Sequence, residues 1–155
     1  GEDGGSHQML EDIALMRALP NMTVIVPADG VEAAAAVKAA AEYKGPVYIR
    51  LGRSKVETIF DENYKFRIGK GTVVKEGTDV TLFACGIMVE TALKAAEILA
   101  SDSINAAVVN LSTIKPLDTA LIVKMAEETK AAVTCEEHTI LGGRKLPDPD
   151  GESWG

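Results

Sequence analysis

The chain has few aromatic residues, no excess of basic charge and no long apolar run. Its 155 residues include three phenylalanines, three tyrosines and one tryptophan, and 16 lysines and arginines stand against 23 aspartates and glutamates, a net charge of −7. Nucleic-acid-binding surfaces usually combine a basic stripe with aromatic rings, so we expect no nucleic-acid partner. No run approaches the roughly 18 apolar residues of a membrane span, so we expect no membrane partner.

Secretion signals and metal motifs are also lacking. No charged segment followed by an apolar stretch marks a signal peptide, and we expect a cytoplasmic protein. Cys85 and Cys135 lie fifty residues apart in apolar runs, without the short spacing of metal-binding cysteines. They are predicted to be buried, reduced thiols. No P-loop and no Gly-x-Gly-x-x-Gly motif after a strand is present, so neither phosphate-binding fingerprint applies.

Apolar runs alternate with helical patterns along the chain, which predicts an α/β fold with a mainly parallel sheet. In the first third we expect a helix over 9–19, a strand over 23–26, a helix over 31–43 and a strand over 47–51. The first helix is apolar nearly all round and is predicted to be well buried. The second is alanine-rich and is predicted to pack closely on a sheet. Asp29 is its predicted cap, with Glu32 in the capping-box position.

Residues 54–70 have no clear period and are predicted to be a linker between two domains. A hairpin is expected next, from strands over 71–75 and 80–85 joined by a turn at Glu76-Gly77-Thr78-Asp79. The remaining elements predict a second, smaller α/β domain ending near residue 143. They are a helix after Gly86, a strand over 106–110, a strand-to-helix connection over 110–118, a helix over about 118–129 and a strand over 131–136. Residues 144–155 are rich in Pro, Asp and Gly and are predicted to be an irregular tail.

Three residues are candidates for binding a substrate. Asp3 and His7 stand on a glycine-rich loop directly before a helix, and Arg53 follows a strand. A histidine before a helix can bind an anion or a sugar hydroxyl, and a guanidinium matches a phosphate. From the residues alone, Asp3 could equally be a turn residue, and His7 and Arg53 could be structural or merely exposed. Arg50 is predicted to point to the opposite face of its strand and to be structural.

The segment Glu136-Glu137-His138 could supply paired acids with a base, or metal ligands. Adjacent glutamates point to opposite faces of a strand, so a structural strand end is the better interpretation. We assign no catalytic residue, no cofactor-binding residue and no metal ligand to the chain.

The motifs together resemble one family. Residues 1–8 (GEDGGSHQ), followed by 20–24 (PNMTV) and 27–29 (PAD), closely resemble the second half of the pyrimidine-binding domain of transketolases. These thiamine-diphosphate enzymes move two-carbon ketol units between sugars. The resemblance extends to about residue 143. It implies a partial pyrimidine-binding domain over 1–53, a linker over 54–70 and the small Rossmann-like transketolase carboxy-terminal domain over 71–143, in a fragment or a split-form subunit.

The resemblance also implies roles for the candidate residues. The residue matching Asp3 binds the hydroxyl beside the acceptor aldehyde, and those matching His7 and Arg53 bind the acceptor's phosphate. The implied cofactor is thiamine diphosphate with Mg or Ca, bound mainly by parts absent here. The family's diphosphate fingerprint needs an Asn-Asn pair that this chain lacks, and the glutamate that activates the cofactor's pyrimidine ring precedes Gly1. The implied partners are sugar phosphates and either a second copy or an amino-terminal transketolase subunit.

Two groups of alternatives stay open. Deoxyxylulose-phosphate synthases usually show His-His in place of His7-Gln8, and 2-oxoacid dehydrogenase β-subunits show Pro-x-His-Ser. The chain could also be a non-catalytic assembly or regulatory module whose domain over 71–143 contacts other subunits. The loop at Gly1 requires a preceding strand, so we expect an inactive fragment with exposed apolar surface.

Overall fold

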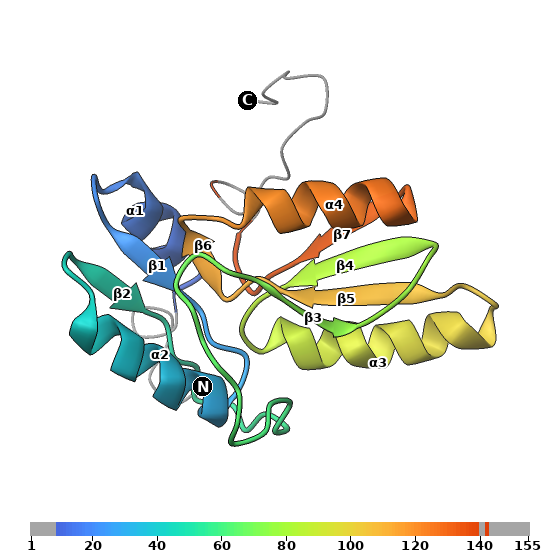
Figure 1. Cartoon of the computed structure of the whole chain (residues 1–155), viewed down its shortest axis with the longest axis horizontal. Coiled ribbons are helices and arrows are strands. Elements are labelled where there is room, and N and C mark those ends of the chain that lie inside the picture. The colour runs from blue at the N-terminus through green and yellow to red at the C-terminus, as the bar shows by residue number, and fades with distance from the viewer. Residues whose placement is uncertain (1–8, 140–141, 143–155) are drawn as a thin grey trace.

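The computed structural model of the chain describes residues 9–139 and residue 142. It contains two mixed β-sheets with helices packed on them, which confirms the predicted α/β fold (Figure 1). A three-stranded sheet has the strand order β2-β1-β6, and a four-stranded sheet has the order β3-β5-β4-β7. None of the described helices is long and apolar enough to cross a membrane.

The first sheet is built around a short buried strand. The first elements along the chain are α1 (Asp12–Ala18), β1 (Thr23–Ile25), α2 (Gly30–Glu42) and β2 (Val47–Ile49). All three residues of β1 are buried, and β1 pairs in parallel with β2. Its other neighbour is β6 (Thr113–Lys115), which pairs antiparallel with it. The sequence predicted only a connection over 110–118, so a strand was missed there. Three residues are too few for a periodic pattern.

In the second sheet, one strand has a parallel neighbour on each side. The elements of this part of the chain are β3 (Thr72–Lys75), β4 (Val80–Ala84), α3 (Met88–Ser101), β5 (Ala106–Asn110), α4 (Thr119–Thr129) and β7 (Ala132–Cys135). Strand β4 pairs in parallel with β5 and with β7, while β3 pairs antiparallel with β5. The predicted hairpin of β3 with β4 is therefore wrong.

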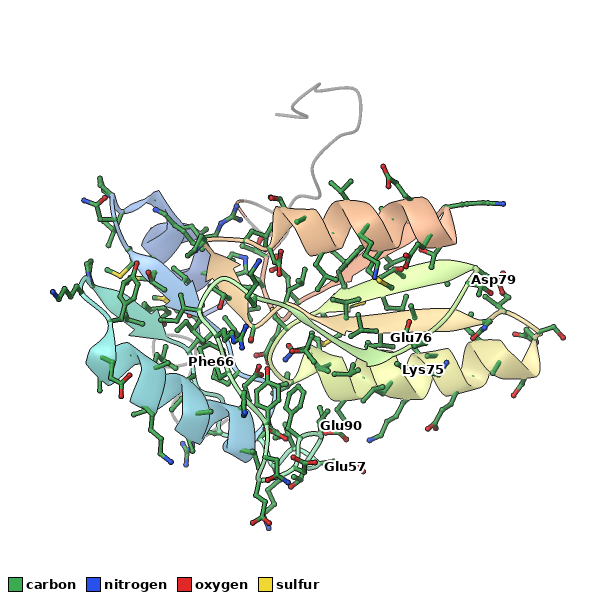
Figure 2. All side chains as sticks on the ribbon, in the orientation of Figure 1. Glu57, Phe66, Lys75, Glu76, Asp79 and Glu90 are labelled. Carbon is green, nitrogen blue, oxygen red and sulfur yellow. The ribbon has the colours of Figure 1, made fainter. Side chains whose placement is uncertain are left out.

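The turn between β3 and β4 explains why no hairpin forms. The amides of Thr78 and Asp79 donate to the Asn105 carbonyl at 2.9 and 3.0 Å, and Asp79 Oδ2 accepts from the Asn105 amide at 2.6 Å. Gly77 lies so close to β5 that a Cβ there would be 2.1 Å from the Ala107 nitrogen. The turn thus docks at the start of β5, so that β3, which precedes the turn, and β4, which follows it, pair with opposite edges of β5 (Figure 2).

Helices α3 and α4 cover opposite faces of this sheet (Figure 1). Successive side chains of a strand point to opposite faces. Accordingly, Leu82 and Val108 lie in the apolar cluster with Val89, Ala92 and Ala96 of α3. The intervening residues of the same strands form a second cluster with α4: Phe83, Ala107, Val109, Ile122 and Met125.

The first helix is less buried than predicted, and the second buries few of its residues. Within α1 only Asp12 and Ile13 are buried, and Leu15 is 55% exposed. Within α2 only Glu32 and Ala36 are buried. Because β1 and β2 are each three residues long, the sheet offers these helices a small packing surface.

Candidate functional site

The strand ends of the two sheets meet where β1 and β4 finish. The Val26 amide donates to the Ser112 carbonyl at 2.7 Å, and the Gly86 amide donates to the Val26 carbonyl at 3.1 Å. Gly86 has φ +56°, and a Cβ on it would be 2.8 Å from Val26 Cγ1. In open α/β sheets, ligands bind beyond the carboxyl ends of strands, so this edge is the candidate site.

Of the three candidate binding residues, Arg53 lies within the described part of the chain. It is exposed on the loop that follows β2. A Cβ on its neighbour Gly52 would lie 3.7 Å from Ile87 Cγ2, so this loop runs beside the start of α3. Asp3 and His7 lie outside the described residues, as does the predicted tail over 144–155.

Arg50 points into a cluster of structural partners, as the sequence predicted. Its Nε lies 3.1 Å from Asp12 Oδ2, and its Nη1 lies 3.0 Å from Glu137 Oε2. Its Nη2 also donates to the Met9 carbonyl at 3.3 Å. The guanidinium therefore joins α1, the loop after β2 and the segment after β7.

Tyr48 completes this cluster. Its hydroxyl donates to Asp12 Oδ2 at 2.8 Å. Burial and the neighbouring Asp12 carboxylate raise the pKa of Tyr48 to about 12, because both disfavour the phenolate.

The segment after β7 reaches the start of α1. His138 Nε2 lies 3.3 Å from the Ala14 amide, and the Thr139 amide donates to the Leu10 carbonyl at 2.9 Å. These contacts join residues more than a hundred positions apart. The sequence predicts a structural strand end at Glu136-Glu137-His138 and carries no local signal for this contact with α1.

A buried carboxylate ties the predicted linker to α2 and to the second sheet. Glu32 is fully buried and accepts from the Ala28 amide at 2.7 Å, the Tyr64 hydroxyl at 2.8 Å and the Asn110 side-chain amide at 2.9 Å. The pKa of Tyr64 is raised by burial and by the charge of Glu32. The carboxylate thus bridges α2, the segment over 54–70 and β5.

Asp29 caps α2 as predicted and also binds the linker. Its Oδ1 accepts from the Glu32 amide at 2.8 Å, and its Oδ2 accepts from the amides of Ile59 and Phe60 at 2.7 and 2.9 Å. The capping box differs from the predicted one, because the Glu32 carboxylate binds the Ala28 amide rather than that of Asp29. A second contact joins the linker to α3, where the Glu57 amide donates to Glu90 Oε2 at 3.1 Å (Figure 2).

Metal ligation finds no support in the described residues. Across 9–139 and residue 142, no group of three or more His, Cys, Asp or Glu side chains could hold a metal ion. Both cysteines are thiols, with Cys85 buried and Cys135 partly buried.

Two family models match the chain and leave residues 59–68 between them. The model of the transketolase pyrimidine-binding domain matches residues 1–58, and that of the transketolase C-terminal domain matches residues 69–145.

Known proteins with the same two parts are also similar. A putative transketolase C-terminal section from Methanocaldococcus jannaschii is 48% identical over 145 residues, which is 92% of this chain and 45% of that protein. A 1-deoxy-D-xylulose-5-phosphate synthase from Heliobacterium modesticaldum is 41% identical, covering 92% of this chain and 22% of that enzyme. A solved structure described as a split-gene transketolase, inactive β4 tetramer, superimposes with a TM-score of 0.87 and 54% identity, covering 90% of this chain and 47% of that one. The chain thus spans less than half the length of each relative.

Proposed function

The chain belongs to the transketolase family, and we propose that it is a fragment or subunit of a thiamine-diphosphate-dependent transketolase. The enzyme would move a two-carbon ketol unit from a ketose phosphate to an aldose phosphate in the cytoplasm, as part of the pentose phosphate pathway. The match of the pyrimidine-binding model over 1–58 carries the proposal, because that range contains all three candidate residues. The activity belongs to the whole enzyme, and we expect this chain alone to be inactive.

Within the enzyme, this chain supplies contacts to the acceptor sugar. Asp3 binds the hydroxyl beside the acceptor carbonyl, and His7 and Arg53 hold its phosphate. Arg53 has the required exposure on the loop after β2. Binding energy from a remote phosphate can orient the reacting carbonyl, which lowers the barrier of the transfer step.

We propose that the cofactor binds mainly outside the described part of this chain. The family implies thiamine diphosphate, whose diphosphate is held through a cation and oxygen donors. Within the described residues, no group of three or more His, Cys, Asp or Glu side chains could hold such a cation. We therefore derive no step through the cofactor and propose that it binds, with Mg or Ca, mainly on parts of the enzyme outside this sequence.

Deoxyxylulose-phosphate synthase is the second candidate activity. The 41% identity to the Heliobacterium enzyme supports it. The pair His7-Gln8 and the segment Leu51-Gly52-Arg53 differ from the His-His and Tyr-Pro-Arg of those synthases, which favours transketolase.

Substitution of Arg53 tests the proposed phosphate contact. In the intact enzyme, Arg53→Ala should raise the KM for a phosphorylated acceptor roughly ten- to hundredfold, since a charge-assisted contact contributes about 1.5–3 kcal/mol. The KM for an unphosphorylated acceptor should change little. Arg67→Ala, which removes another exposed arginine from the segment over 54–70, is the matched control and should leave both values unchanged. Equal effects of Arg53→Ala on the two acceptors would exclude the role.

A further inference from the structure

The loop that carries Arg53 follows β2 and contains no helix or strand from residue 50 to residue 60. Arg53 and most of its neighbours in this loop are exposed. An exposed segment without regular structure keeps one conformation where other parts of the protein hold its backbone, because ordering each residue costs conformational entropy. The contacts that hold this loop therefore decide where the Arg53 guanidinium stands.

Both ends of the loop are held by the part of the chain before the linker. At its start, the Arg50 amide donates to the Ile25 carbonyl of β1 at 2.9 Å. At its end, Asp29 Oδ2 accepts from the amides of Ile59 and Phe60 at 2.7 and 2.9 Å. Asp29 is only 4% exposed, so this end is anchored in the protein interior. The segment over 51–58, which contains Arg53, lies between these two anchors.

The middle of the loop is held by the start of α3. Glu90, in the first turn of α3, accepts from the Glu57 amide through Oε2 at 3.1 Å, and Figure 2 shows these two residues close together. Ile87, which precedes the helix, lies beside Gly52, because a Cβ on that glycine would be 3.7 Å from Ile87 Cγ2. The start of α3 thus contacts the loop both before and after Arg53.

Glu90 is itself fixed in place. Its Oε1 accepts from Lys94 Nζ one helical turn later, while its Oε2 binds the loop, so each carboxylate oxygen has its own partner. The hydrogen bonds from Lys94 and from the Glu57 amide lower the pKa of the Glu90 carboxyl, which is therefore a charged acceptor at neutral pH. The preceding residue, Val89, is fully buried against the second sheet. A side chain on a packed helix can hold a loop more precisely than another loop can.

We propose that Glu90 is a positioning residue for binding of the acceptor's phosphate. It fixes the loop over 50–60 on α3 and so sets where the Arg53 guanidinium stands. This role rests on the proposed function, because the effect of Glu90 on the acceptor passes through Arg53. It gives the part of the chain after the linker a share in substrate recognition without a contact to the substrate.

The kinetic test is a double-mutant cycle in the intact enzyme. Glu90→Ala should raise the KM for a phosphorylated acceptor roughly two- to tenfold, the range of one hydrogen bond. The kcat and the KM for an unphosphorylated acceptor should stay nearly unchanged. Glu90→Gln keeps an acceptor oxygen for the Glu57 amide and should remain within about twofold of the wild type. In an Arg53→Ala background, Glu90→Ala should add no further increase. The same increase in both backgrounds, or for both acceptors, would overturn the proposal.

The sign of the effect separates positioning from simple electrostatics. Loss of a negative charge near a phosphate site should by itself favour the phosphate and lower the KM, whereas loss of the anchor should raise it. Glu97→Ala is the matched control, because it removes an exposed glutamate from a later turn of the same helix, and it should leave the KM unchanged. A fall in the KM of Glu90→Ala, or an equal rise in Glu97→Ala, would also overturn the proposal.

Hydrogen exchange separates failure of the anchor from failure of the proposed function. Glu90→Ala should speed exchange in peptides covering 51–58, which contain the Glu57 amide, and leave those of α4 unchanged, whatever reaction the enzyme catalyses. Unchanged exchange over 51–58 would overturn the anchor and the proposal with it. If exchange rises but Arg53→Ala itself leaves the acceptor KM unaltered, the proposed phosphate contact fails. The positioning role then fails too, while the anchor on α3 stands.

Discussion

At the residue scale, buried polar groups join distant parts of the chain. Glu32 accepts hydrogen bonds from α2's entry, from the segment over 54–70 and from β5. The sequence predicted that Asp29 and Glu32 begin a helix, because capping is a local pattern. It could not predict that Tyr64 and Asn110 also bind the Glu32 carboxylate. These residues lie 32 and 78 positions after Glu32, and no local pattern connects residues so far apart.

Removing the Glu32 carboxylate should be costly. Glu32→Leu keeps the volume but leaves the Ala28 amide, the Tyr64 hydroxyl and the Asn110 amide without this acceptor, each at about 1–3 kcal/mol. We expect a loss of about 3 kcal/mol or more in the free energy of unfolding, measured by urea titration. Glu32→Gln should lose less, because the Tyr64 hydroxyl can rotate and accept. The control Glu42→Leu, at an exposed glutamate of the same helix, should stay within about 0.5 kcal/mol of the wild type. A similar loss in both Leu variants would contradict the role of the buried network.

Tyr48 makes stability depend on alkaline pH. Its pKa is raised from 10.0 to about 12 in the folded state, so between these values the unfolded chain releases a proton that the folded chain retains. The stabilisation is complete below pH 10.0 and is lost as the pH rises toward about 12. Tyr48→Phe should therefore be less stable than the wild type at neutral pH, by about 1 kcal/mol for the lost hydrogen bond, and the gap should narrow in this window. Unfolding midpoints of both proteins across the pH range measure it, and a constant gap would argue against the shift.

At the element scale, the sequence located most helices and strands but not all of their neighbours. Apolar runs and caps are local signals, and they placed α2, β4, β5 and α4 within one or two residues. The turn over 76–79 was also correct as a turn. The residues of the turn predict that the chain reverses there, but they do not predict which strands pair. In the structure β3 pairs with β5 rather than with β4. Strand β6 had no periodic pattern and depends on β1 for its partner.

Gly77 is the residue that allows the turn to dock on β5. A Cβ there would meet backbone atoms of Ala106 and Ala107 at 2.2 and 2.1 Å, and backbone cannot move aside as a flexible side chain can. Gly77→Ala should destabilise the protein by about 1–3 kcal/mol or more through this overlap. Gly30→Ala is the matched control, since its Cβ would meet nothing within 4 Å, and it should be neutral or slightly stabilising. Thermal unfolding of the two variants compares them directly, and equal midpoints would contradict this account of the turn.

At the scale of the whole molecule, the parts of the chain before and after the predicted linker over 54–70 contact each other. Strand β6 lies within the range of the C-terminal model yet pairs with β1, and His138 and Lys115 hold the two ends of α1. Family motifs and alternation were enough to predict the fold class. The roles of Asp3, His7 and Arg53 stay predictions. The contacts that position α1 could not be predicted, because they join residues far apart in the sequence.

Exposed apolar side chains are unevenly divided between the units, which bears on the proposed partner. Among the described residues before the predicted linker, the exposed large hydrophobic side chains are Met9, Leu10, Leu15, Leu19, Val37, Tyr43 and Leu51. Those after it are fewer: Ile98, Ile104, Val123 and Val133. Because more of these side chains lie in the part before the predicted linker, we expect the partner subunit to contact α1 and α2.

A charge placed on each unit tests which one binds the partner. Val37 on α2 is 51% exposed and Ile98 on α3 is 68% exposed, so neither Val37→Glu nor Ile98→Glu buries a charge within the chain. In mixtures with the amino-terminal transketolase subunit, Val37→Glu should weaken assembly at least about tenfold, because a carboxylate would be desolvated in the interface. Ile98→Glu should leave assembly unchanged. Size-exclusion chromatography with light scattering measures both. The reverse result would move the contact to the unit over 71–143 and favour the assembly-module alternative over a catalytic subunit.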